Sequence, residues 1–314
     1  MRKLGATELE VFPVCLGGNV FGWTASEAES FAVLDAYVAA GGNFVDTADA
    51  YSAWAPGNAG GESEEILGRW MASRGNRERV VVATKVGKLA GLTGLSAGTI
   101  RKAAEDSLRR LRIDRIDLYY AHADDPATPL EETLGAFDAL VREGKVREIA
   151  ASNYAAPRLA EALAVSSRLG LTRYVALQPH YNLVHRAEYE GELQALCVRE
   201  GLAVFPYYAL ASGFLAGKYR PGAAVASARS GAAAKHLDGP GLRVLATLDS
   251  VAAERGTTVA AIALAWLLGR PGIVAPIASA RTPDQLAELL PAAALSLTAE
   301  ERDRLEAASR PPGG

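Results

Sequence analysis

The chain of 314 residues is poor in cysteine and histidine, with two cysteines and four histidines. Cys15 and Cys197 lie far apart, and neither has another cysteine or a histidine nearby at metal-ligand spacing. These absences exclude a small fold held by disulfides, and no metal site is predicted. A reducing, cytoplasmic environment suits the two thiols.

The sequence also lacks an excess of charge of either sign. It has 33 basic and 36 acidic residues and a net charge of −3. Binding of nucleic acid or an anionic membrane usually requires an excess of positive charge, which this sequence lacks. Glu8, Glu10 and Pro13 interrupt the N-terminal segment, so it does not resemble a secretory signal. No apolar run reaches the roughly 18 residues that a bilayer span needs. We therefore expect neither nucleic acid nor a membrane as a partner.

The composition is that of a globular protein, with 49% apolar and 22% charged residues. A chain of this length buries roughly three quarters of its unfolded surface, which excludes a disordered or fibrous protein. The length fits one large barrel or two ordinary domains. Because no Pro-rich or charged linker divides the sequence, we predict a single domain over residues 1–314.

Short runs rich in Val and Ile alternate with segments of helical periodicity. This alternation predicts βαβ units and a parallel sheet, and eight repeats predict a (β/α)8 TIM barrel. The expected strands are 14–16, 43–46, 80–85, 116–122, 146–151, 174–178, 203–207 and 273–277. The expected helices are 26–40, 62–74, 97–111, 130–143, 156–169, 189–200, 241–255 with 258–269, and 283–290.

Three segments lie outside this repeat. The first ten residues, with Gly5 in a turn, predict an N-terminal β-hairpin that closes the floor of the barrel. Residues 298–308 predict an extra C-terminal helix, in which Thr298 and Glu301 have the spacing of a capping box. Residues 208–240 form a long segment rich in Gly, Ala and Ser, and loops of that length are usually functional or mobile.

Polar side chains stand at the ends of successive predicted strands, where the active sites of such barrels lie. The second strand ends at Asp46, with Tyr51 just beyond it, and the third and fourth end at Lys85 and His122. Each residue alone has an ordinary structural interpretation, as a helix cap, a rim aromatic, a solvated strand end or a core histidine. Their convergence on one barrel mouth favours a catalytic site.

Together, the four residue types make a specific chemistry possible. A lysine ammonium beside a tyrosine hydroxyl stabilises the phenolate, so we expect Lys85 to lower the pKa of Tyr51 from about 10. Asp46 would keep Lys85 charged, and a neutral His122 would donate a hydrogen bond to a carbonyl oxygen. Such a site assists reactions that build negative charge on that oxygen, including hydride delivery to an aldehyde or ketone.

From about residue 3 to about residue 310, the sequence resembles the aldo-keto reductase family. The matching segments are GGNFVDTADAYS (41–52), GGESEEILGRWM (60–71), VVATKVG (81–87), DLYYAHADD (117–125), GKVREIAASNY (144–154), LQPHYNL (177–183), FPYYALASGFLAGKY (205–219) and APIASARTPDQL (275–286). The resemblance implies that Asp46, Tyr51, Lys85 and His122 are catalytic, with Tyr51 as the proton donor. It further implies NADP(H) as cofactor and a small-molecule carbonyl compound as substrate.

The resemblance also implies a set of cofactor-binding residues. Side chains at the ends of the fifth to seventh strands would hold the nicotinamide, the following loop would wrap the pyrophosphate, and the segment after the eighth strand would hold the adenosine end. No acidic residue lies between Ile277 and Pro283, which favours the 2′-phosphate of NADP(H) beside Arg281. The expected residues are Gly18, Asp46, Ser152, Asn153, Gln178, Tyr207, Leu210, Ser212, Lys218, Ser279, Arg281 and Gln285.

Some of these residues have alternative interpretations. Gln285 has capping-box spacing from Thr282, Ser152 and Asn153 can cap the fifth helix, and Tyr207 can belong to the core. Three departures from the family pattern are visible. They are Tyr207-Tyr208-Ala209-Leu210 in place of Tyr-Ser-Pro-Leu, Leu289 in place of an asparagine, and Gly18-Asn19 in place of Gly-Thr.

Three functions are weighed on this basis. The first is an NADPH-dependent carbonyl reductase, and the second is a redox-sensing regulatory subunit that binds the nicotinamide cofactor with little turnover. The third is an unrelated barrel such as a phosphosugar isomerase or a glycosidase. A glycosidase needs carboxylates from separate strand ends, and Asp124 and Asp125 share one loop.

The rim aromatics Trp23, Trp54 and Tyr208 either line a substrate pocket or pack against neighbouring loops. The natural substrate and the oligomeric state are left open.

Overall fold

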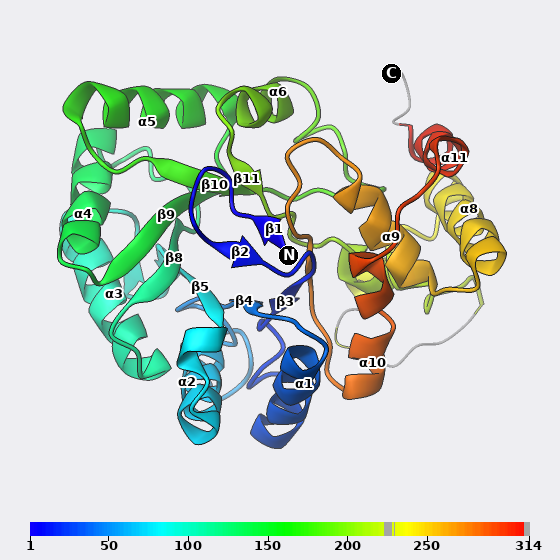
Figure 1. Ribbon diagram of the computed structural model, residues 1–314, viewed down its shortest axis with the longest axis horizontal. Coiled ribbons are helices and arrows are strands. Elements are labelled where there is room, and N and C mark those ends of the chain that lie inside the picture. Colours follow the sequence, from blue (N-terminus) through cyan, green and yellow to red (C-terminus); the bar gives the residue numbers. More distant parts are fainter. Residues whose placement is uncertain (223–227, 229, 311–314) are drawn as a thin grey trace.

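The computed structural model describes residues 1–222, 228 and 230–310 (Figure 1). An eight-stranded parallel sheet with strand order β11-β10-β9-β8-β5-β4-β3-β12 forms its centre. The strands are β3 (Cys15–Gly17), β4 (Phe44–Asp46), β5 (Val81–Val86), β8 (Ile116–Ala121), β9 (Val146–Ser152), β10 (Tyr174–Gln178), β11 (Ala203–Val204) and β12 (Ile277–Ala278).

The two ends of this sheet meet. Val204 of β11 forms a parallel bridge with Ile273, and the Ile277 amide donates to the Pro206 carbonyl at 2.8 Å. These bonds join the last two strands and close the sheet into the expected (β/α)8 barrel.

Helices form the outer layer around the sheet (Figure 1). The α-helices are α1 (Glu27–Ala39), α2 (Glu62–Arg74), α3 (Ala97–Leu111), α4 (Leu130–Arg142), α5 (Ala156–Leu169), α6 (Glu192–Arg199), α7 (Ser230–Ala234), α8 (Gly239–Arg255), α9 (Val259–Leu268), α10 (Pro283–Ala287) and α11 (Ala299–Ser309). The 3₁₀ helices are η1 (Arg77–Arg79), η2 (Ala211–Ala216) and η3 (Leu290–Ala293). The expected C-terminal helix is confirmed, and Thr298 and Glu301 form its capping box.

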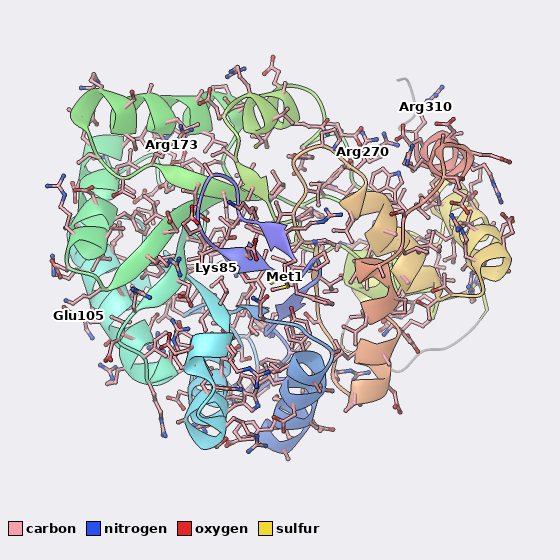
Figure 2. The ribbon with its side chains drawn as sticks, in the orientation of Figure 1. Met1, Lys85, Glu105, Arg173, Arg270 and Arg310 are labelled. Atoms are coloured by element: carbon pink, nitrogen blue, oxygen red, sulfur yellow. The ribbon has the colours of Figure 1, made fainter. Side chains whose placement is uncertain are left out.

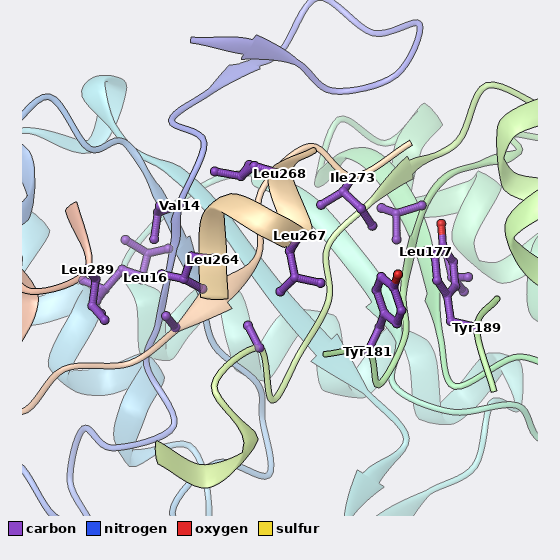
Figure 3. Packing of buried hydrophobic residues seen from close by; sticks show 14 of the residues in the cluster. Val14, Leu16, Leu177, Tyr181, Tyr189, Leu264, Leu267, Leu268, Ile273 and Leu289 are labelled. Carbon is purple, nitrogen blue, oxygen red and sulfur yellow. The ribbon is translucent and has the colours of Figure 1, made fainter. Parts of the chain in front are cut away.

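Two hydrophobic clusters fill the barrel and the space outside it. The interior cluster combines bulky side chains such as Phe44, Tyr120 and Phe205 with alanines such as Ala83 and Ala176. Mixing large and small side chains fills a narrow barrel without voids. The outer cluster lies between the strands and the helices, and Figure 3 shows the part of it around α9. The residues of α9 are apolar on every side because the helix is buried on every side.

The N-terminal hairpin, β1 (Arg2–Lys3) paired with β2 (Glu10–Val11), lies across one end of the barrel (Figure 1). Leu4, Leu9 and Val11 belong to the interior cluster, and Gly5 turns the chain with φ +57°. The predicted closure of the barrel floor is therefore confirmed.

Strands seven and eight are shorter than predicted. The expected ranges were 203–207 and 273–277, but β11 ends at Val204 and β12 begins at Ile277. Pro206 and Pro276 have no N–H to donate to a neighbouring strand, so each interrupts the regular ladder.

Two predicted helices also need correction. The helix expected over 189–200 begins only at Glu192, because Gly191 has φ 100° and breaks the helical path. The helix expected over 283–290 ends at Ala287, and a separate 3₁₀ turn that contains Pro291 follows.

Two further features concern the loops. A hairpin of β6 (Lys88–Leu89) and β7 (Leu92–Thr93), which was not predicted, follows β5. The 208–240 segment contains η2 and α7, and part of it lies outside the described residues.

Within the described chain, no single helix is long and apolar enough to cross a membrane. The pair α8 and α9 passes that test only together and is bent by 98°.

Candidate active site

Lys85, at the end of β5, is the centre of a buried polar network, and Figure 2 labels it near the middle of the ring of strands. Its side chain is completely buried, as is that of Asp46 at the end of β4. Lys85 Nζ donates to Asp46 Oδ1 at 2.6 Å, to the Thr47 carbonyl at 2.8 Å and to Tyr51 Oη at 2.8 Å. All three ammonium protons therefore have acceptors, which makes burial of the charge tolerable.

Tyr51 bridges the two charged groups. Its hydroxyl accepts from Lys85 and donates to Asp46 Oδ1 at 3.1 Å. Burial, followed by the negative charge of Asp46, raises the pKa of Tyr51 well above 10. The sequence predicted a lowered pKa, and that prediction is wrong for the protein without ligands because burial outweighs the ammonium. Tyr51 therefore keeps its proton throughout the neutral range.

His122 follows β8 and lies edge-on to Tyr51, with ring centroids 6.1 Å apart at an interplanar angle of 73°. Burial, followed by the positive charges of Lys85 and Lys88, holds the pKa of His122 well below 6.5. Its Nδ1 is buried and has no hydrogen-bond partner among the described residues. The imidazole is therefore neutral at pH 7 and carries a single N–H donor, as predicted.

A second group of polar side chains lies beside the first. Gln178 Nε2, at the end of β10, donates to Asp46 Oδ2 at 2.9 Å. The Ser152 hydroxyl donates to the Gln178 carbonyl, and Asn153 Nδ2 donates to Ser152 Oγ. Asn153 Oδ1 accepts from the Tyr207 hydroxyl at 2.7 Å. Since α5 has Ala155 at its N-cap with no side-chain cap, Ser152 and Asn153 do not cap that helix.

The loop after β11 has unusual backbone geometry. Tyr208, Ala211, Ser212 and Gly213 all have positive φ, between 46° and 94°. Such conformations cost free energy in non-glycine residues and cluster at ligand clamps. Asn182 Nδ2 donates to the Tyr208 carbonyl at 2.9 Å, which holds the loop where the family's proline is missing. Leu210, Ser212 and Lys218 line the same cleft as Asp46, Tyr51 and His122, which together with Lys85 form the predicted catalytic tetrad.

The segment after β12 lines the far end of this cleft. Ser279 donates to Asn19 Oδ1 at 2.6 Å, while Gln285 Oε1 accepts the Arg281 amide at 3.0 Å. The Arg281 guanidinium lines the cleft and makes no hydrogen bond or ion pair with any described residue. Leu289 closes this end with an apolar side chain that is only 4% exposed.

These groups share one cleft of about 840 Å³, within the size range of small-molecule sites. Of the predicted catalytic residues, Asp46, Tyr51 and His122 line it, and Lys85 lies directly beneath. The predicted aromatics also line it. Trp23 and Trp54 pack edge to face at 5.5 Å, while Trp54 and Tyr208 are each 50% exposed.

Gly18 is the one predicted cofactor residue that does not line the cleft. Its amide donates to the Asp46 carbonyl at 2.7 Å, and its carbonyl accepts from Ser63. A Cβ at Gly18 would lie 2.9 Å from Ser63 Oγ. Gly18 therefore positions the end of β4, and its neighbours Gly17 and Asn19 line the cleft instead.

Sequence reasoning missed Asn19, Lys88 and Glu288 as lining residues of the cleft. Asn19 was noted only as a departure from the family pattern. Lys88 follows Lys85 by three residues, and Gly87, Gly91 and Gly94 around it were the available signal of a turn that returns the chain to the barrel mouth.

One group in the described chain has ligand atoms close enough to suggest a metal. His180, His185 and Glu188 bring these atoms within 4.8 Å of one another. The two imidazoles are stacked, with centroids 3.6 Å apart and planes 11° apart. Their lone pairs therefore lie in two separate, nearly parallel planes, an arrangement in which both imidazoles cannot point directly at one ion. The predicted absence of a metal site stays a prediction.

Comparison with known proteins identifies the family. The model of the Aldo/keto reductase family matches residues 13–310. The chain belongs to the aldo/keto reductase family. The resemblance inferred from the sequence is thereby confirmed, together with the barrel fold.

Curated relatives match over most of this chain. An uncharacterized oxidoreductase of Bacillus subtilis, YrpG, is 36% identical over 99% of this chain and 96% of its own length. The norsolorinic acid reductase stcV of Emericella nidulans is 34% identical over 95% of this chain and 78% of its own. A probable voltage-gated potassium channel subunit beta of Oryza sativa subsp. japonica is 34% identical over 98% and 95%. The family and the names of these relatives support an oxidoreductase.

Proposed function

We propose that this aldo/keto reductase is an NADPH-dependent enzyme that reduces aldehydes or ketones to alcohols. The observation that carries the proposal is the contact of Tyr51 Oη with both Lys85 Nζ and Asp46 at the floor of an open cleft. This arrangement provides a protonated hydroxyl beside a buried cation, which suits protonation of a carbonyl oxygen.

The residues of this chain perform the proton part of the reaction. When bound, NADPH would supply the hydride for the carbonyl carbon. Tyr51 turns its proton from Asp46 to the carbonyl oxygen, and neutral His122 donates a second hydrogen bond there. The phenolate that remains lies 2.8 Å from Lys85 Nζ. Lys85 therefore stabilises the new negative charge on the product side of the proton transfer, while burial and Asp46 keep the net pKa of the resting tyrosine raised.

The cleft has suitable groups for each part of NADP(H). Ser152, Asn153 and Gln178 present amide and hydroxyl groups for the carboxamide of the nicotinamide. The left-handed residues around Ser212 form a loop of the kind that curls around phosphates. Arg281 offers to the 2′-phosphate a guanidinium that makes no hydrogen bond or ion pair with any described residue. Helix α10 has only five residues, so the guanidinium is the main attraction for that phosphate and the helix dipole adds little.

A panel of aliphatic and aromatic aldehydes and ketones tests the proposal by the loss of NADPH absorbance, with NADH in parallel. We expect turnover of at least one reactive aldehyde, faster with NADPH than with NADH. The same panel with Tyr51→Phe separates enzymatic reduction from background reaction. Tight NADPH binding without turnover of any aldehyde would contradict the proposal.

A regulatory subunit that binds the nicotinamide cofactor with little turnover is the second candidate. The match to a protein named as a potassium channel subunit beta favours it. The complete tetrad suits both candidates, so the measured turnover decides between them.

We also infer a cytoplasmic location. It is supported by two buried free thiols, Cys15 and Cys197, which suit a reducing compartment. Fractionation of the source cells tests this.

A further inference from the structure

Lys88 stands at the substrate end of the cleft, and none of the described residues is its counter-ion. It is the first residue of β6, and its side chain lines the cleft together with Trp54, Ala90 and His122. No described residue makes a hydrogen bond or ion pair with the Lys88 ammonium. The other cations of the cleft, Lys218 and Arg281, belong to the loops assigned above to the cofactor.

The hairpin that carries Lys88 is fixed against the barrel. Lys88 pairs with Thr93 across the hairpin. Leu89 occupies the space above Gly60, where a Cβ would lie 2.5 Å from Leu89 Cδ1. Just beyond β7, the Leu95 amide donates to Asp125 Oδ2 at 2.8 Å. The backbone of Lys88 is therefore held in place beside the tetrad.

The charges around Lys88 leave it uncompensated. Burial and the positive charge of Lys85 lower the pKa of Lys88, and Lys88 in turn helps to lower the pKa of His122. Of the carboxylates in this part of the barrel, Asp46 pairs with Lys85 and Asp124 pairs with Arg158, while burial raises the pKa of Asp49 to about 7. Lys88 is exposed to solvent at the mouth of the cleft, and a cation beside other positive groups attracts an anion more strongly once a ligand displaces water from the cleft.

We propose that Lys88 binds an anionic group of the substrate, so that the preferred substrates are carbonyl compounds that carry a carboxylate. The exposed Trp54, packed against Trp23, covers the apolar body between the carboxylate and the reacting carbonyl. Tyr51 lies next to Trp54, with ring centroids 6.0 Å apart, so the two recognition elements and the proton donor share one side of the cleft. This inference rests on the proposed carbonyl reduction.

The test compares 4-carboxybenzaldehyde with 4-carbamoylbenzaldehyde, which have similar shape but differ in charge. We expect the wild type to have the higher kcat/KM for the acid. In Lys88→Met the ratio of the two kcat/KM values falls about tenfold, chiefly through KM of the acid, as for loss of a charge-assisted contact. Lys88→Arg keeps most of the ratio. The preference for the acid weakens as ionic strength rises.

Lys3→Met is the matched control, because Lys3 is exposed on β1 at the opposite end of the barrel. It removes the same charge from the chain and leaves both kcat/KM values unchanged. A wild type without preference for the acid, or a Lys88→Met ratio equal to that of the wild type, overturns the proposal.

A binding measurement separates this inference from the proposed reduction. The affinity of 4-(hydroxymethyl)benzoate, the alcohol corresponding to the acid aldehyde, is measured by calorimetry with NADP⁺ present and absent. Weaker binding to Lys88→Met than to wild type supports the anion site even if neither aldehyde is reduced, in which case the reduction alone fails. Equal affinities for the two proteins overturn the anion site.

Discussion

Gln178 Nε2 donates to Asp46 Oδ2 at 2.9 Å, while Asp46 Oδ1 accepts from both Lys85 and Tyr51. One carboxylate therefore joins a residue assigned to the nicotinamide with the residues assigned to proton transfer. A cofactor that engages the Gln178 amide will also act on the geometry of the tetrad. The predictions below test the parts of this arrangement separately.

Tyr51→Phe removes the proton donor and keeps the aromatic ring. We expect the catalytic rate for aldehyde reduction to fall by about 10² or more, as for the loss of a general acid, with little change in NADPH affinity. Stopped-flow kinetics and fluorescence titration measure the two quantities. Tyr154→Phe, which removes a buried hydroxyl bonded to Tyr174, is the control. A Tyr51→Phe enzyme with most of its activity would remove Tyr51 from the mechanism.

Lys85→Met leaves the buried Asp46 carboxylate without its cation. The free energy of unfolding should fall by about 3 kcal/mol, as for a broken buried ion pair. The reduction rate should also fall at every pH where the protein is folded, because the phenolate of Tyr51 loses its stabilising charge. Urea denaturation and a pH-rate profile test this, with the exposed Lys102→Met as control. Wild-type activity at pH 7 would assign Lys85 a purely structural role.

Arg281→Ala should remove the preference for NADPH over NADH. We expect the wild type to bind NADPH at least about tenfold more tightly, or roughly 1.4 kcal/mol, because the guanidinium forms no hydrogen bond or ion pair within the described part of the chain and is available to the 2′-phosphate. The variant should keep its NADH affinity. Quenching of tryptophan fluorescence measures both affinities, and Glu288→Gln removes the acidic group at the same end of the cleft for comparison. An equal loss for both cofactors would contradict the role in phosphate recognition.

Asp49→Asn should stabilise the protein above neutral pH. Both carboxylate oxygens of Asp49 are buried without a hydrogen-bond partner among the described residues, and burial, followed by the charge of Glu64, raises its pKa from 3.8 to about 7. Between these values the folded state holds a proton that the unfolded state has released. The contribution of Asp49 to stability is therefore present below pH 4 and is lost as pH rises to 7, by roughly 4 kcal/mol in total.

Urea denaturation at pH 5 and pH 8 tests this prediction. The stability gained by Asp49→Asn over the wild type should be larger at pH 8 than at pH 5. The exposed Asp114→Asn is the control and should show no such difference. A gain of the same size at both pH values would mean that Asp49 does not titrate in this window.

Much of the barrel was predictable because its signals are local. Apolar β-branched runs and the capping box of Thr298 with Glu301 depend on residues close in sequence. The strand ends could then be aligned, since parallel strands of a barrel present their C-terminal ends at one rim. The prolines that shorten β11 and β12 were visible in the sequence. Their effect depends on whether the neighbouring strand has a carbonyl that would otherwise accept a hydrogen bond at that position.

The sequence by itself determined the barrel, the tetrad residues and the family, because residue type and spacing carry that information. The tertiary structure alone decided that burial raises the pKa of Tyr51 despite Lys85, that Gln178 bonds to Asp46 across 132 positions, and that Lys88 faces the cleft. Desolvation and pairwise electrostatics depend on which groups are brought together and how much water they retain. Those quantities exist only once the chain has folded.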